Sequence, residues 1–277
     1  MKLRANCKIN IGLDILRRRP DGFHDLETVM VPVRGLFDEV HVERLPAGTP
    51  AEEGVLFGQR GIAVDCSAAD NTCIKAYRAV RERYNIDPVR ILLDKRVPYE
   101  AGMGSASSDA AAVIVALNEL FALGMDEDEM VATAARTGSD VPFFIRNTPQ
   151  LCSGRGEIMS PVELPLAGKW LVILKPSEGV PTREAYAGVR PAVPAVPLAG
   201  RLAQPLDRWQ GSVKNDFEEG IFAARPAIGA LKGQLLAAGA LYASMSGSGS
   251  AVFGIFADEP AHIAAPQADT FIHIEQL

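Results

Sequence analysis

Ala101-Gly102-Met103-Gly104-Ser105-Ala106-Ser107-Ser108-Asp109 is the stretch that decides the interpretation of this chain, because it runs directly into an apolar segment, 110–123, with the pattern of a helix. Glycines let the backbone approach an anion closely, serines add hydroxyl donors, and a helix start presents N–H groups at its positive end. The combination suits a phosphate group. A second interpretation stays open, in which the stretch is a turn followed by a helix cap, since Ser and Asp both cap helices well.

The composition is that of a folded, acidic chain. It has 277 residues, of which 48% are hydrophobic, and 28 Lys plus Arg against 34 Asp plus Glu give a net charge of −6. This length predicts one large domain or two ordinary ones. The net negative charge gives no electrostatic basis for binding duplex nucleic acid. The longest apolar run, 110–117, is far shorter than the ~20 residues of a membrane span. We therefore expect no nucleic-acid partner and no membrane insertion.

The cysteines and the first residues indicate a cytoplasmic protein. The four cysteines form no C-x-x-C pair and have no zinc-like spacing with the four histidines. A chain this long with so few cysteines is not built on disulfides, and residues 1–8 never reach the apolar core of a signal peptide. We expect reduced thiols and a cytoplasmic location.

Strands and helices mix without strict βαβ alternation, so the expected fold class is α+β. The pattern of the sequence changes after residue 149, which predicts a domain boundary near residue 155. This boundary divides the chain into 1–155 and 156–277. An exposed loop or hairpin tip is expected over 46–61 and an irregular crossover over 188–207. The patterns predict strands over 2–16, 26–34, 38–44, 89–93, 170–174, 241–244 and 251–257, and helices over 72–84, 110–123, 126–137, 215–223 and 226–238.

Lys8 and Asp140 are candidates for a catalytic pair. Lys8 and Asn10 lie two apart in a predicted strand, so their side chains share one face. Phosphoryl transfer to an alcohol needs a carboxylate that receives or orients the hydroxyl proton and a cation that stabilises charge. Asp140, in Gly-Ser-Asp-Val-Pro, supplies the carboxylate. The plainer alternatives are a solvated edge lysine and a helix N-cap aspartate.

Phe23 and His24, after the Asp-Gly turn at 21–22, can stack on a base and hydrogen-bond its edge. By itself such a pair is as well explained by one core and one surface residue, and Tyr186 is equally ambiguous. The Ser-Gly-Ser-Gly-Ser-Ala stretch over 246–251 allows close backbone packing before a strand. No Walker A loop and no protein-kinase signature occurs in the chain.

Together and in this order, these stretches resemble the GHMP kinase superfamily, small-molecule kinases named for galactose, homoserine, mevalonate and phosphomevalonate. The resemblance rests on 98–111 as a glycine-rich phosphate loop and on 246–251 as a supporting third motif. It runs from residue 5 to about residue 256. Further pieces are similar to the branch that acts in non-mevalonate isoprenoid synthesis: 5–10, 18–24, 138–144 and 214–218.

The resemblance implies a two-domain GHMP kinase fold. Its N-terminal domain is similar to ribosomal protein S5 domain 2, its C-terminal domain is ferredoxin-like, and the active site lies between them. The implied reaction is ATP-dependent phosphorylation of the C2 hydroxyl on the methylerythritol end of a small molecule with a cytidine diphosphate group. Mg²⁺ would bridge the nucleotide phosphates, and no protein ligand is assigned to it. The oligomeric state is left open.

The resemblance also implies roles for individual residues. Lys8 and Asp140 are the catalytic pair. Phe23 and Tyr186 enclose the cytosine, and His24 hydrogen-bonds its edge. The full substrate-binding set is Asn10, Phe23, His24, Thr182 and Tyr186, and the ATP-binding set is Asn71, Lys95, Gly102, Gly104, Ser105, Ser107 and Ser108, with Asn71 and Lys95 near the adenosine.

The chain departs from the family's pattern in three places. Ala101, Ser105 and Ala106 stand where relatives often have glycine, Phe23 stands where tyrosine is common, and the end from Pro260 matches poorly. Two other functions stay open: a homoserine- or mevalonate-type kinase, and a catalytically silent regulator that binds nucleotide.

Overall fold

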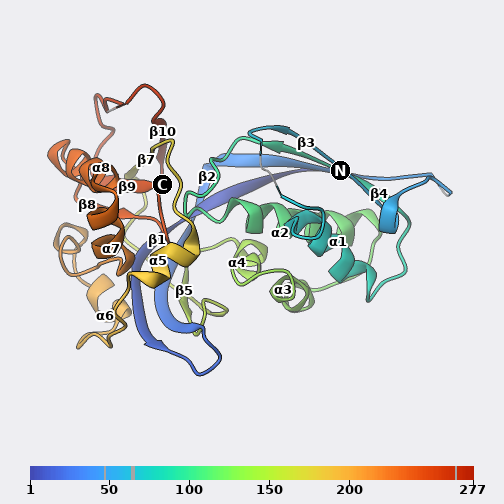
Figure 1. Ribbon diagram of the computed structural model, residues 1–277, viewed down its shortest axis with the longest axis horizontal. Helices are drawn as coiled ribbons and strands as arrows, with labels where there is room; N and C mark the ends of the chain where they lie inside the picture. The colour runs from blue at the N-terminus through green and yellow to red at the C-terminus, as the bar shows by residue number, and fades with distance from the viewer. Residues whose placement is uncertain (47, 64–65, 266) are drawn as a thin grey trace. The chain divides into compact units, whose positions relative to one another are not determined.

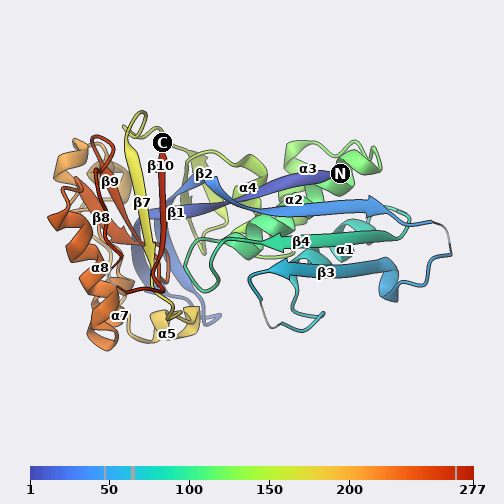
Figure 2. The same cartoon turned by 90° about the horizontal axis from the view of Figure 1, so that it is seen from above.

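The computed structural model of the protein describes residues 1–46, 48–63, 66–265 and 267–277. The chain forms two compact units, whose elements are labelled in Figures 1 and 2. Unit 1 comprises Met1–Cys7, Pro32–Tyr99 and Gly104–Thr148, and unit 2 comprises Lys8–Val31, Glu100–Met103 and Pro149–Leu277.

The units are not consecutive segments of the chain. The two longest strands, β1 (Lys2–Arg18) and β2 (His24–Arg44), each contribute residues to both units. Leu13, Ile15 and Leu26 of these strands lie in the hydrophobic core of unit 2, which explains why 8–31 belongs there. The compact units therefore differ from a division at residue 155. Where the two family domains meet in the sequence stays a prediction.

Unit 1 is a sheet covered by helices on one face, as Figure 1 shows. β4 (Val89–Lys95) pairs antiparallel with the end of β2 and parallel with β3 (Val55–Gly61). Burial alternates along β4, with Ile91 buried and Leu92 exposed, because successive side chains point to opposite faces. The helices of this unit are α1 (Thr72–Arg81), α2 (Ser105–Leu120), α3 (Glu127–Ala135) and α4 (Val141–Arg146), with a 3-10 turn, η1, at Glu52–Gly54.

Unit 2 contains an antiparallel sheet in the order β10-β7-β9-β8, visible side by side in Figure 2. Helix α8 packs on β8 and β9. The strands are β7 (Trp170–Lys175), β8 (Tyr242–Met245), β9 (Val252–Phe256) and β10 (Phe271–Gln276), and β5 (Gln150–Ser153) and β6 (Ile158–Pro161) extend the pairing of β2. The helices are α5 (Thr182–Ala187), α6 (Leu198–Leu202), α7 (Phe217–Ala224) and α8 (Pro226–Ala237), with a 3-10 turn, η2, at Leu206–Arg208.

The α+β fold class is confirmed, and the helix that was expected over 110–123 differs at both ends. α2 begins at Ser105, so the serines form its first turn instead of a loop. It begins there because Gly104 has left-handed backbone (φ 66°) and serves as the N-cap. The helix ends at Leu120 and Phe121 is its C-cap, so Gly124 is not the cap residue.

Several strands differ from the predictions. The segments 26–34 and 38–44 belong to the single strand β2, which continues through Gly35. Val55–Gly61 forms the strand β3, although an exposed loop or hairpin tip is expected over 46–61. Residue 47 of that segment lies outside the described residues. The crossover at 188–207 contains α6. The strands β5, β6 and β10 were not predicted from the sequence.

Among the residues that the structure describes, no helix combines the length and the apolar character needed to cross a bilayer.

Leu235 on α8 tests the core of unit 2, because its side chain is fully buried there. Leu235→Ala is expected to lower the free energy of unfolding by about 2–5 kcal/mol, from lost burial and the cavity left behind. The exposed Val193 of the same unit is the control, and Val193→Ala should stay within about 0.5 kcal/mol of wild type. Urea unfolding curves measure both; equal effects would mean that this core is wrongly placed.

Candidate active site

Lys8 is buried in the middle of β1, so the interpretation as a solvated edge lysine is wrong. Its side chain is 3% exposed. Lys8 Nζ donates to the carbonyl oxygen of Gly102 at 2.8 Å and also to Asn10 Oδ1. The Lys8 amide donates to the carbonyl of Met103 at 3.0 Å. The lysine is therefore fixed on the main chain of the predicted phosphate loop.

Asn10 extends this contact into a buried polar network in unit 2. Asn10 Nδ2 donates to Thr28 Oγ1 at 3.1 Å, and the Thr28 hydroxyl donates to the carbonyl of Gly12 at 2.5 Å. The Asn10 amide donates to Ser246 Oγ at 3.2 Å, and that hydroxyl donates to the Gly102 carbonyl at 3.0 Å. Lys8, Asn10, Gly102 and Ser246 thus form one connected set.

The third motif packs directly against the loop at 100–103. Gly102 has left-handed backbone (φ 69°), and a Cβ there would lie 1.9 Å from the carbonyl oxygen of Ser246. Two main-chain hydrogen bonds join the segments, from Ser250 N to Glu100 O at 3.1 Å and from Ala251 N to Ala101 O at 3.2 Å. The close backbone packing expected of 246–251 is present.

Asn215, within the 214–218 piece of the resemblance, holds the third motif from the other side. Its Nδ2 donates to the carbonyls of Met245 and Gly247 at 2.8 Å each. Its Oδ1 accepts from the amide of Phe217 at 3.0 Å. The two N–H groups of this buried side chain therefore shape the loop that contacts Gly102, while its oxygen binds the start of α7.

The first turn of α2 carries the remaining residues of the phosphate loop. Ser105, Ser107 and Ser108 lie in this turn, and the N-cap residue Gly104 has no side chain that could accept from its N–H groups. Capping by Ser or Asp, the plainer interpretation of this stretch, is therefore not what starts the helix. An uncapped N-terminus on a 16-residue helix is a favourable place for phosphate.

A cavity of about 570 Å³ in unit 1 includes Asn71 in its wall. This volume lies within the range of small-molecule sites. Asn71 is also the N-cap of α1, where its Oδ1 accepts from the amides of Cys73 and Ile74 at 3.0 and 3.3 Å. The other wall residues are Glu53, Val55, Phe57, Gln59, Arg60, Gly61, Ala63, Cys66, Ala68, Ile74 and Arg78.

The side chain of Lys95 has other partners than a nucleotide. Its ammonium lies between the buried carboxylates of Asp38 and Asp109. Its carbonyl oxygen accepts from Ile62 N at 2.8 Å, next to Gly61 of the cavity wall. The backbone of Lys95 is thus adjacent to the cavity while its ammonium is occupied, and a contact of this residue with adenosine stays a prediction.

The aromatic residues predicted to enclose a cytosine lie in unit 2. His24 stacks on Tyr186, with ring centroids 4.9 Å apart and an interplanar angle of 20°. Phe23 is 55% exposed, and the guanidinium of Arg155 lies 4.9 Å from the centre of its ring. Thr182 Oγ1 lies 3.3 Å from Ser248 Oγ of the third motif. The enclosure of a base between Phe23 and Tyr186 stays a prediction.

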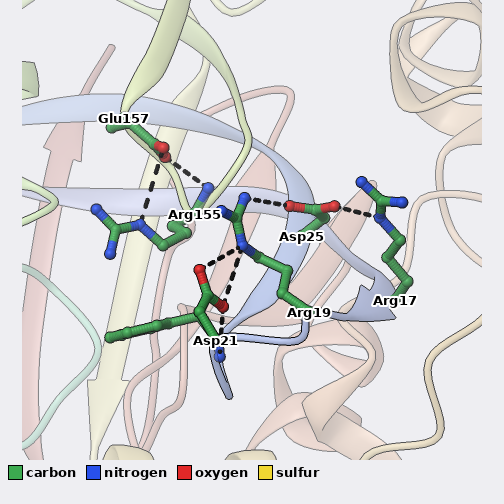
Figure 3. A network of polar contacts seen from close by, with 7 residues as sticks. Arg17, Arg19, Asp21, Asp25, Arg155 and Glu157 are labelled. Carbon is green, nitrogen blue, oxygen red and sulfur yellow. Dashed lines mark hydrogen bonds and ion pairs between the residues drawn. The ribbon is translucent and has the colours of Figure 1, made fainter.

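Arginines and aspartates hold the turn that carries Phe23 and His24, as Figure 3 shows. Arg19 donates to Asp21 at 3.0 Å and to Asp25 at 2.9 Å, and Asp21 accepts from the amide of Phe23 at 3.1 Å. Arg17 also donates to Asp25. Hydrogen bonds from both arginines lower the pKa of Asp25, so the network is fully charged at neutral pH.

Arg225 holds the short helix α5, which carries Thr182 and Tyr186. It donates to Glu178 Oε1 at 2.6 Å and to Glu184 Oε2 at 2.8 Å. Its hydrogen bonds lower the pKa of Glu184. A bidentate arginine is a geometrically specific anchor, so it orients a helix that is too short to be stable by itself.

Asp140 is the N-cap residue of α4 in unit 1, but its side chain makes no capping hydrogen bond within the described part of the chain. The helix-cap interpretation therefore does not account for this carboxylate. Lys8 belongs to unit 2 and Asp140 to unit 1. That their side chains face one another stays a prediction.

Sequence reasoning missed five residues that shape the site: Thr28, Asp38, Asn215, Arg225 and Ser246. Asn215 and Ser246 lie in motifs that were recognised, so a role could have been assigned to them. Thr28, Asp38 and Arg225 lie outside any motif. Only the fold brings them next to the partners described above.

Comparisons with known proteins agree with this architecture. Residues 71–148 match the GHMP kinases N terminal domain, and residues 195–268 match the GHMP kinases C terminal domain. The chain belongs to the GHMP kinase family. These kinases use ATP as the phosphate donor, and the two-domain GHMP fold expected for the chain is confirmed.

Three similar proteins carry the same name. The 4-diphosphocytidyl-2-C-methyl-D-erythritol kinase of Parabacteroides distasonis is 41% identical over 98% of this chain and 98% of its own. The kinase of that name from Cytophaga hutchinsonii is 43% identical over 92% of each chain. A crystal structure of 4-(cytidine 5'-diphospho)-2C-methyl-D-erythritol kinase has a TM-score of 0.75 and 33% identity, covering 92% of this chain and 90% of that one.

Gly102→Ala tests the packing of the third motif on the phosphate loop of this GHMP kinase. The left-handed backbone alone should cost about 1–2 kcal/mol, and the overlap with the Ser246 carbonyl should add to it and raise the KM for ATP. Gly239 is the control, because its backbone is also left-handed (φ 98°) but a Cβ there would meet no atom within 4 Å. Urea unfolding and steady-state kinetics measure both variants. If the two are equally destabilised, the contact at Gly102 is not tight.

Proposed function

We propose that this GHMP kinase transfers the γ-phosphoryl group of ATP to the C2 hydroxyl of 4-diphosphocytidyl-2-C-methyl-D-erythritol. The observation that carries the proposal is the buried Lys8, whose ammonium is bound to the Gly102 carbonyl of the phosphate loop. A cation fixed on that loop is suited to phosphoryl transfer, and relatives at 41% and 43% identity bear the name of this kinase.

In the proposed mechanism, Asp140 orients the substrate hydroxyl or accepts its proton. Lys8 offsets negative charge on the γ-phosphate as the phosphoryl group moves. Asn10 and the Gly102 carbonyl hold the lysine in place. A pre-positioned cation needs no reorganisation when the phosphoryl group moves.

The ATP phosphates are proposed to bind at Gly102, Gly104 and the first turn of α2. Main-chain N–H groups and the serine hydroxyls there donate to phosphate oxygens. The adenosine is proposed to occupy the cavity beside Asn71, whose Oδ1 is already bound to the helix amides. Its Nδ2, which donates to Cys66 Sγ at 3.9 Å, is proposed to contact the nucleoside with its second N–H, together with the backbone around Lys95.

The cytidine end of the substrate is proposed to bind at Phe23, His24 and Tyr186. His24 covers one face of Tyr186 in this structure, so a base between Phe23 and Tyr186 would take the place of the imidazole. The displaced His24 would then hydrogen-bond the base edge. Thr182 lies on the same helix, α5, at the third motif.

Mg²⁺ is proposed to accompany ATP. Among the residues that the structure describes, no group of three or more His, Cys, Asp or Glu side chains could hold a metal ion. Mg²⁺ in kinases is bound largely by the phosphates, with few protein ligands, so the residues present fit a metal that arrives with the nucleotide. When bound, it neutralises charge on the phosphates.

We also propose that the protein works in the cytoplasm on small molecules alone. Cys7, Cys73 and Cys152 are buried, and no disulfide occurs among the described residues, which suits a reducing compartment. The net charge of −6 gives no basis for nucleic-acid binding.

Asp140→Asn and Lys8→Met test the catalytic pair. Turnover of the diphosphocytidyl substrate should fall by about 10²–10⁴-fold in each, the usual contribution of a positioned acid–base group, while Asp140→Asn still binds ATP. Asp128→Asn, an exposed carboxylate of the same unit, is the matched control and should keep wild-type turnover. A coupled ADP-release assay measures activity, and circular dichroism checks folding. Near wild-type turnover in a folded variant would remove that residue from the mechanism.

CDP tests the choice of substrate. CDP should compete with the alcohol substrate, and Tyr186→Ala should weaken both by about tenfold, as expected for loss of one stacked aromatic worth 1–3 kcal/mol. Tyr84→Ala, on the loop after α1, is the control. Activity that is indifferent to CDP would favour a homoserine- or mevalonate-type kinase. ATP binding without ADP release for any alcohol would favour a silent regulator.

A further inference from the structure

Three charged side chains are buried together in unit 1 beside the first turns of α2. Lys95 Nζ lies 2.5 Å from Asp38 Oδ2 and 2.8 Å from Asp109 Oδ2. The three side chains are 3%, 0% and 2% exposed, in that order. Lysine and aspartate are almost never buried this fully unless they are paired. Lys95, Asp38 and Asp109 are called the charge cluster below.

The charge cluster ties together the two points where the phosphate-loop segment joins unit 1. Asp38 Oδ1 accepts from the amides of Arg96 and Val97 at 2.5 and 2.8 Å, directly after β4. Asp109 lies four residues after Ser105, the first residue of α2, so both are on one helix face. Lys95 bridges the two aspartates. The spacing between the end of β4 and the start of α2 is therefore set by buried charges.

One carboxyl of the charge cluster is close to the point at which it gains or loses a proton. One ammonium and two carboxylates carry a net charge of −1 when all are ionised, and zero when one carboxyl holds a proton. Burial raises the pKa of Asp109 to about 7, with Lys95 lowering it and Asp38 raising it. Burial alone would lower the pKa of Lys95, but the two carboxylates raise it, so the ammonium stays charged. The thiol of Cys73 on α1 also interacts with Asp109, and burial raises the pKa of this thiol well above its usual value.

The second oxygen of Asp109 also indicates a place for a proton. Asp109 Oδ1 is buried and has no hydrogen-bond partner within the described residues. An ionised carboxylate with a desolvated, unpaired oxygen is costly, and protonation removes the charge from that carboxyl and so lowers the cost of burying it.

We propose that the charge cluster positions the phosphate loop and takes up a proton from the solvent when nucleotide phosphates bind at the start of α2. This inference rests on the proposed function, because it needs the phosphates of ATP at this helix. The incoming phosphates bring negative charge towards Asp109, and a like charge favours the protonated carboxyl. The proton goes to an Asp109 oxygen, which leaves one carboxylate opposite the Lys95 ammonium. Lys95 is then a positioning residue, which acts on the phosphate site through helix α2.

The test is calorimetry of AMP-PNP, a non-hydrolysable ATP analogue, with Mg²⁺ in buffers of different ionisation enthalpy. Near pH 7 the wild type should take up more protons on binding than Asp109→Asn, which keeps an oxygen for Lys95 but cannot titrate. Between pH 6 and 8 the wild-type affinity should fall by about fivefold more than that of the variant, a usual size for coupled sites. The higher pH weakens binding because it ionises Asp109.

Glu119→Gln is the matched control. Glu119 is an exposed carboxylate on the same helix, and the change from carboxyl to amide is the same. This control should show the proton uptake of the wild type. The titration of the nucleotide itself is common to all proteins and cancels in the comparison.

Equal proton uptake by the wild type and a folded Asp109→Asn would overturn the inference and leave the proposed function standing. Absence of AMP-PNP binding by the wild type would contradict the nucleotide site itself. If Asp109→Asn does not fold, Asp38→Asn replaces it, because it removes the carboxylate that raises the pKa of Asp109 and should also lose the uptake. A role in folding alone would lower the melting temperature without changing proton uptake.

Discussion

The carbonyl oxygen of Gly102 is the acceptor on which the site in unit 2 depends. It receives the Lys8 ammonium and the Ser246 hydroxyl, at 2.8 and 3.0 Å. Because Gly102 has no side chain, the main chain of the third motif can lie against it. One carbonyl therefore determines where the lysine, the phosphate loop and the third motif lie relative to one another. A charge-assisted hydrogen bond in a buried place is strong enough for this purpose.

The helix that follows the loop is held by different chemistry. Neutral groups surround the Lys8 ammonium at Gly102, whereas α2 is held by the Lys95 ammonium between two carboxylates. Burying such charges is a weak source of stability and a good source of specificity in position. The protein thus uses one buried lysine at Gly102 and another beside Asp109 of α2, and the two lysines perform different tasks.

Much of this architecture could be predicted from the sequence. The phosphate loop and the third motif have unusual composition and a definite order, so the family followed from them, while the α+β class followed from the mixing of strands and helices; both are confirmed. Helix α3 was predictable because Asp126 caps it and acidic residues fill its first turn. The start of α2 was not, since it depends on the backbone conformation of Gly104 and serine favours a cap as well as a first turn.

Partners distant in the chain were beyond sequence reasoning. Asp38 and Lys95 are 57 positions apart, and no sequence motif links one to the other. β10 pairs with β7, about a hundred residues earlier, so its place in the sheet depends on a distant partner. The meeting of Lys8 with Asp140 has the same character and stays a prediction.

The path of β1 and β2 has a consequence for the evolution of this chain. Leu13, Ile15 and Leu26 complete a core whose other members come from residues 172–256. A recombination event near residue 155 would join β1 and β2 of one parent to the sheet of the other parent. Mismatched side chains would then meet inside the core. The two halves of the gene are therefore expected to be inherited together. Substitutions in β1 and β2 should be accompanied by compensating substitutions in the strands and helices after residue 170.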